Sequence, residues 1–233
     1  MKRETKEENQ PKPLTKIQTM TTNEFKTAAI VTGAATVIAN ASQAADAGSV
    51  DDLIAKIKSQ DDKIRGPAWQ GAGPAGAPAV KPLAAVMMDE NFEVARSAKR
   101  GLYKIVRHAG RPGADRERQA VQAELLALLQ NQPTPVRCEV LWMLSEIADA
   151  KAVASMAALL ADADTREDAR CALMRIPGKQ VTKAFTNAFK TAPEDFKFAL
   201  AESLRKRGET VKGYPSKKLT PTKQTTVGPS TKT

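Results

Sequence analysis

One spacing of apolar residues recurs along this chain and limits the folds that it can adopt. The segments that begin at Val94, Val136 and Thr165 each carry apolar or small residues at positions i, i+4, i+8 and i+11. The residues concerned are Val94, Ala98, Leu102, Ile105, Val136, Val140, Leu144, Ile147, Thr165, Ala169, Leu173 and Ile176. This spacing places one apolar stripe along a helix, so the pattern predicts several amphipathic helices of one kind.

A second set of helical segments lies between the first. They read GAPAVKPLAAVMM, RQAVQAELLALLQ, AKAVASMAALLAD and KQVTKAFTNAFKT. The anchors Ile64, Val94, Val136, Thr165 and Phe196 are separated by 30, 42, 29 and 31 residues. Neither helix can bury its stripe alone, but stacked pairs form a continuous core. We therefore predict an all-α fold, an α-α superhelix of about four to five two-helix repeats.

Composition agrees with thin helical layers. Hydrophobic residues make up 42% of the 233 residues, but aromatic residues only 4%. Strands favour β-branched and aromatic side chains, and no long alternating run is present. The composition therefore favours closely packed helices.

The order of the two helices resembles a known repeat pattern, PLxxLLxD followed by VRxxAxxAL. The match is seen in DENFEVARSAKRGLYKI, PTPVRCEVLWMLSEIADAKAVASMAALLAD and DTREDARCALMRI. Residues 50–208 thus resemble bacterial HEAT-like repeats, including those named after phycobilisome lyases. The resemblance implies a binding scaffold, and it implies that a turn Asp such as Asp89 pairs with an Arg in the position of Arg137. It does not identify the partner, because one fold serves many functions.

The first 44 residues predict an export signal. Lys26 precedes the uncharged stretch Thr27–Ala39, and small residues follow, with cleavage expected after Ala44. A stretch of this length is too short to cross a membrane comfortably. Alternatives are cleavage after Ala41, a start at Met20, or a leader without a signal. We expect a periplasmic or secreted protein, with a cytoplasmic location as the alternative.

Basic residues gather in one part of the chain. The whole chain carries a net charge of +10, and residues 91–118 hold eight basic and three acidic side chains. The anchors Val94 and Val136 are 42 residues apart, more than any other neighbouring pair of anchors. The extra length falls in Arg107–Arg118, where Gly and Pro predict a basic loop. Arg and aromatic side chains are common anchors in protein interfaces. The candidate partner-binding residues are Arg96, Arg100, Tyr103, Arg107 and Trp142, on the side opposite the apolar stripes, and Arg111 in the basic loop.

A second irregular segment, Arg65–Val80, is rich in Gly and Pro. These residues weaken helices. We expect a short helix over Ala68–Ala72, a turn, and a new helix near Pro78.

Residues suited to catalysis or to cofactor binding are few. His108 is the only histidine, and neither Cys138 nor Cys171 lies in a CxxC motif. We therefore predict no metal, no cofactor and no enzymatic activity. The two cysteines lie among Ala and Leu, which favours buried thiols over a disulfide, although only geometry can decide. HEAT-like DNA-repair glycosylases are a rival that the low aromatic content disfavours.

The chain is thus divided into a leader (1–44), a repeat domain (45–208) and a basic Thr/Lys/Pro tail (209–233) that we expect to be disordered. The tail could contact a membrane surface or an acidic protein. Two functions remain. The first is an exported scaffold that binds another protein. Export would exclude chromosomal nucleic acid as a partner. The second is a cytoplasmic basic scaffold that binds nucleic acid or an enzyme.

Overall fold

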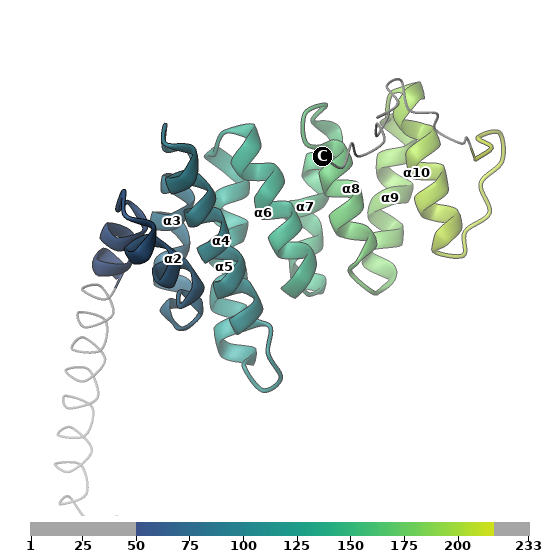
Figure 1. Ribbon diagram of the computed structural model, residues 1–233. Helices are drawn as coiled ribbons and strands as arrows, with labels where there is room; N and C mark the ends of the chain where they lie inside the picture. The colour runs from purple at the N-terminus through teal and green to yellow at the C-terminus, as the bar shows by residue number, and fades with distance from the viewer. Residues whose placement is uncertain (1–49, 217–233) are drawn as a thin grey trace, which may run out of the picture. The chain divides into compact units, whose positions relative to one another are not determined.

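The computed structural model describes residues 50–216, all within one compact unit. The predicted export signal and the tail beyond residue 216 lie outside the described residues. Every regular element in the described range is helical (Figure 1). A helix over residues 50–57 is followed by α2 (Asp62–Gln70), α3 (Val80–Val86), α4 (Phe92–Ala109), α5 (Asp115–Asn131), α6 (Thr134–Ile147), α7 (Val153–Ala158), α8 (Arg166–Met174), α9 (Lys179–Thr191) and α10 (Glu194–Lys206).

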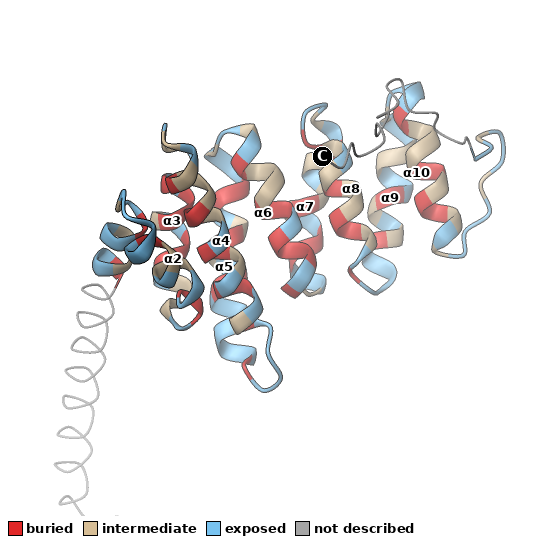
Figure 2. Ribbon diagram, viewed as in Figure 1, coloured by how far each residue is buried: buried red, intermediate tan, exposed pale blue. Residues whose placement is uncertain are grey.

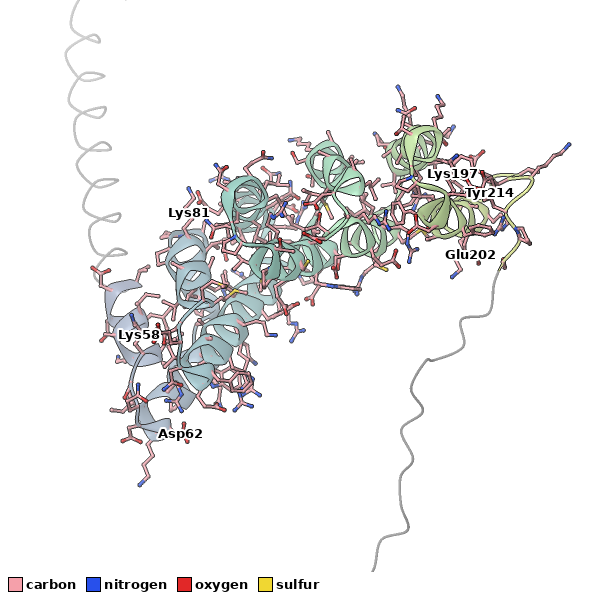
Figure 3. The ribbon with its side chains drawn as sticks, turned by 90° about the horizontal axis from the view of Figure 1, so that it is seen from above. Lys58, Asp62, Lys81, Lys197, Glu202 and Tyr214 are labelled. Carbon is pink, nitrogen blue, oxygen red and sulfur yellow. The ribbon has the colours of Figure 1, made fainter. Side chains whose placement is uncertain are left out.

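These helices stack in two layers. Successive helices pair, α3 with α4, α5 with α6, α7 with α8, and α9 with α10. Across pairs, α2, α4, α6, α8 and α10 contact one another in series, and we call them the α4 layer. The other layer consists of α3, α5, α7 and α9. Figure 3 shows Asp62 of α2 and Lys81 of α3 in different layers. The predicted α-α solenoid is confirmed.

The core lies between the layers and includes the predicted stripes together with apolar residues of α3, α5, α7 and α9 (Figure 2). In α4 and α6 every stripe residue is at most 5% exposed. Thr165, the polar member of the third stripe, is buried, and its hydroxyl donates a hydrogen bond to the Leu159 carbonyl at 3.3 Å. The first anchor is wrong, because Ile64 is 46% exposed while Arg65 is buried. Arg65 donates to the Ser59 carbonyl at 2.6 Å, which compensates for its burial.

The predicted basic loop is also wrong. The 42-residue step contains two long helices, α4 with 18 residues and α5 with 17, joined by residues 110–114. Arg107 lies in α4 and Arg118 in α5. The short connection turns through Gly113, whose φ of 81° suits glycine. Helix α4 is long because Val106 and Ala109 extend its buried side by a further turn.

The segment rich in Gly and Pro is more helical than predicted. Helix α2 begins at Asp62 and runs through Pro67. The predicted start at Ala68 was therefore too late. Two short 3₁₀ turns, Gly73–Ala75 and Ala77–Ala79, then lead into α3, which begins two residues after Pro78.

The folded domain continues past the predicted boundary at residue 208. The Tyr214 ring packs edge-on against Phe189 and Phe198, with ring centroids 5.1 and 5.2 Å away. Arg205 donates a hydrogen bond to the Tyr214 carbonyl at 2.7 Å. Figure 3 shows Tyr214 beside α10. Residues 209–216 therefore cover the end of the last helix pair.

Candidate functional site

Helix α4 carries more Lys and Arg side chains than any other helix of the α4 layer. Arg96, Arg100, Tyr103 and Arg107 fall at positions i, i+4, i+7 and i+11, opposite the buried stripe that starts at Val94. Helical periodicity thus places a basic stripe on the surface. Asn91 starts the helix, and its side-chain oxygen accepts hydrogen bonds from the backbone N–H groups of residues 93 and 94 at 2.9 and 3.3 Å.

Three side chains of α4 contact carboxylates on α6. Lys99 Nζ lies 2.9 Å from Glu139 Oε1, and the Tyr103 hydroxyl donates to Glu139 Oε2 at 3.2 Å. Arg107 Nε lies 3.2 Å from Glu146 Oε2. Burial, together with the charge of Glu139, raises the pKa of Tyr103 well above its usual value. The contacts fix α4 against α6.

The series of contacts continues from α6 along the layer. Trp142 Nε1 donates to Asp168 Oδ1 of α8 at 2.7 Å. Arg137 Nη1 lies 2.9 Å from Asp162 Oδ2, in the turn before α8. Arg166 of α8 in turn reaches Asp195 of α10 at 2.7 Å. The pairing of Arg137 with a turn Asp is of the kind that the repeat resemblance implied.

Two cations on α4 have no such partner. Arg100 and Lys104 are both exposed, and among the described residues no carboxylate pairs with either. Both lie over the half-buried ring of Trp69 on α2, with Arg100 Cζ 5.2 Å and Lys104 Nζ 6.0 Å from its centroid. Cation–π contact orients the cations without neutralising their charge. We call Trp69, Arg100 and Lys104 the Trp69 cluster.

The structure separates the six predicted residues into two groups. Arg100 belongs to the Trp69 cluster. The other five are engaged within the molecule: Arg96 with Glu93, Tyr103 with Glu139, Arg107 with Glu146, Arg111 with Glu117, and Trp142 with Asp168.

The candidate partner-binding residues chosen from the sequence did not include Trp69 or Lys104. Lys104 follows Arg100 by four residues, and this spacing was a usable signal. Trp69 lies in a segment rich in Gly and Pro, so its place on a helix could not be predicted from the sequence.

A basic cavity adjoins the Trp69 cluster at the end of α4. Its volume is about 550 Å³, and its lining includes Lys104, Arg107, His108 and Arg111. Arg111 Nη2 lies 2.6 Å from Glu117 Oε1, and this guanidinium lowers the pKa of the Glu117 carboxyl. The cavity extends the positive surface, but its arginines are already paired.

The two cysteines are free and half-buried, so the predicted full burial is corrected. Burial raises the pKa of the Cys138 thiol to about 11, and the neighbouring Asp168 carboxylate adds to this effect. Over residues 50–216, no three His, Cys, Asp or Glu side chains are grouped so that they could hold a metal ion. No helix in that range is both long and apolar enough to span a membrane.

Comparisons with known proteins give structural matches only. No known protein family and no curated protein sequence matches the chain. An engineered protein from a structural genomics consortium is 19% identical, covers 70% of this chain and 80% of its own, and gives a TM-score of 0.37. A designed armadillo repeat protein, solved in complex with the peptide (KR)4, is 16% identical, covers 67% and 86%, and gives a TM-score of 0.35. The solenoid assignment rests on the helix packing described above.

Proposed function

We propose that this protein is a non-enzymatic helical-repeat scaffold that binds an acidic segment of another protein through the Trp69 cluster. The observation that carries the proposal is the pair of exposed cations, Arg100 and Lys104, held over Trp69 without a carboxylate partner among the described residues. A positive, partly aromatic surface on a rigid helix suits the capture of an acidic chain.

The neighbouring charges favour a protein over nucleic acid. Lys99, Arg107 and Arg96 are already paired with carboxylates. Binding to a phosphate backbone strengthens with the number of phosphates neutralised, so two available cations give little affinity. Two cations suffice for a pair of acidic side chains in a peptide.

Site-specific photo-crosslinking tests this proposal. A photoreactive amino acid replaces Arg100 in one variant and Arg116 in another, and the crosslinked proteins from native cells are identified by mass spectrometry. Arg116 is a suitable control because it is exposed on α5 and has no described carboxylate partner. We expect a defined protein at position 100 that is absent at position 116 and is lost with Lys104→Glu. Equal crosslinking at both positions, or crosslinking to nucleic acid alone, would contradict the proposal.

We further propose that the protein is exported, on the basis of Lys26, the uncharged stretch Thr27–Ala39 and the small residues that end at Ala44. The test is to express the full chain in bacteria, fractionate the cells, and sequence the N-terminus of the accumulated protein. A start at Ala45 or Ser42 in the periplasmic fraction would support export. An intact N-terminus in the cytoplasm would refute it, and the cytoplasmic alternative would then stand.

A further inference from the structure

An apolar pocket opens at the other end of the exposed side of α4. It has a volume of about 290 Å³, and its apolar lining includes Met87, Met88, Phe92 and Pro135. Phe92 is 71% exposed and Met88 50%, which makes them the two most exposed large hydrophobic residues in the described range. Exposed apolar side chains that line a pocket indicate an interaction site more strongly than isolated ones do.

Polar groups around the pocket indicate what it accepts. Arg96, Lys99 and Glu139 help to line it, and Lys99 Nζ lies 2.9 Å from Glu139 Oε1. Arg96 lies over the Phe92 ring, with its Cζ 5.5 Å from the ring centroid, and it pairs with Glu93. The charged groups at the pocket are therefore engaged within the molecule. The pocket suits an apolar side chain, and the cations that can take up acidic groups of the same segment are Arg100 and Lys104.

Helix α4 contributes to both features, with Phe92 in the pocket and Arg100 and Lys104 in the Trp69 cluster. The rise of an α-helix places Arg100 about 12 Å and Lys104 about 18 Å along the axis from Phe92. An extended chain covers these distances in about four and about six residues. One short segment can therefore reach both features.

We propose that the bound segment is extended and carries a bulky apolar side chain in the Met88–Phe92 pocket. It carries acidic side chains about four and six residues away, at Arg100 and Lys104. The inference rests on the proposed function and specifies the recognition motif of the same partner. The apolar anchor provides affinity, and the carboxylates fix position and direction.

Fluorescence polarisation with synthetic peptides tests the motif on the full-length protein. Each labelled peptide has about twelve residues, mostly Gly and Ser, with one leucine and two glutamates at the spacing given above, in both chain directions. A matched peptide has glycine in place of the leucine, and another has glutamines in place of the glutamates. We expect the loss of the leucine to weaken binding about tenfold, since burial of one such side chain is worth at least that much.

Variants then link each part of the peptide to its site. Phe92→Ser or Met88→Ser should weaken the leucine peptide and leave the glycine peptide unchanged. Arg100→Gln and Lys104→Gln should weaken both peptides, and less so as salt is raised. The controls are Ile64→Ser, which removes an exposed apolar residue elsewhere, and Arg116→Gln, which removes an equal charge. Circular dichroism confirms that each variant is folded.

The outcomes separate this inference from the proposed function. Equal binding of the leucine and glycine peptides would overturn the pocket motif and leave the acidic partner in place. Equal effects of Ile64→Ser and Phe92→Ser would also overturn it. If no peptide binds, the inference fails, and the crosslinking at position 100 decides separately whether a protein binds there. Displacement of the peptides by a single-stranded oligonucleotide at lower concentration would favour nucleic acid instead.

Discussion

At the level of single residues, side chains of the α4 layer connect one repeat to the next. Lys99, Tyr103 and Arg107 contact α6, and Trp142 contacts α8. Each exposed ion pair contributes about 0–1 kcal/mol, so their main effect is on the relative position of the helices. The same contacts leave Arg100 and Lys104 as the available cations of α4.

Cys138 offers a direct measurement on this surface. In a Cys171→Ser variant, Cys138 is the only thiol, and its reaction with iodoacetamide can be followed against pH. Burial and Asp168 raise the pKa of this thiol to about 11, from 9.0 for an ordinary cysteine. We expect the midpoint of the rate profile near the higher value, and a lower midpoint after Asp168→Asn. A midpoint near 9.0 in the folded protein would contradict the arrangement.

The raised pKa also has a consequence for stability. The folded protein holds the thiol proton more tightly than the unfolded chain does. The resulting stabilisation is fully present below pH 9 and is lost as the pH rises through about 11. Urea unfolding of the Cys171→Ser variant should show this loss, and the further change Cys138→Ser should remove it.

Helical periodicity was sufficient to place the candidate residues of α4 on its exposed side. It could not show which of them are free to bind a partner and which pair with side chains of the same molecule. Tyr103 and Arg107 pair with residues 36 and 39 positions away. Such partners depend on how two repeats stack, and no local pattern encodes that. Lys104 was predictable from its spacing to Arg100, whereas the position of Trp69 required the path of α2.

At the level of the helices, Gly and Pro were given too much weight. Residues 107–118 were expected to form a loop, but the buried stripe of α4 continues to Ala109 and α5 begins at Asp115. Burial of apolar surface in both helices outweighed the turn signal, which applies only to residues 110–114. Likewise α2 continues through Pro67, because Gly66 has no Cβ to clash with the proline ring.

Two glycines in these helices should respond differently to alanine. A Cβ at Gly101, in the middle of α4, would lie 3.4 to 3.6 Å from Ile57, Ala72 and Leu83, which is ordinary contact. Gly101→Ala should therefore stabilise the fold by up to about 1 kcal/mol through helix propensity. A Cβ at Gly66 meets nothing within 4 Å, yet the following proline opposes it.

We expect Gly66→Ala to give no gain or a loss. Thermal and urea unfolding of both variants measure the difference. An equal gain in the two would show that Pro67 imposes no constraint on α2. A loss for Gly101→Ala would show that the packing around α4 is tighter than these distances indicate.

At the level of the whole molecule, the repeat pattern predicted the fold because the same stripe spacing recurs. The stripes after Val94, Val136 and Phe196 are buried as expected. What the pattern could not give is how the array ends. Ile64 is exposed at the first unit, while residues 209–216 fold over the last. End units have a neighbour on one side only, so the general pattern does not apply to them.

Residues 209–216 cover the helix pair α9 and α10, and this leads to a prediction about how stability is distributed along the array. In a stacked array each repeat depends mainly on its neighbours, so damage at one end should remain local. Tyr214→Ala removes the ring that packs against Phe189 and Phe198, and aromatic burial of this kind is worth about 1–3 kcal/mol. Hydrogen exchange should therefore accelerate in α9 and α10 and remain unchanged in α3, α4 and α5.

The matched variant Tyr214→Phe keeps the ring contacts and loses the hydroxyl, which lies 3.4 Å from Glu194 Oε2 at the exposed surface. It should leave exchange in α9 and α10 nearly unchanged, because an exposed hydrogen bond adds little. If Tyr214→Ala accelerated exchange equally in every helix, the array would unfold as one cooperative unit. The local transmission expected of stacked repeats would then be wrong, and a partner bound at α4 would stabilise the distant pairs as well.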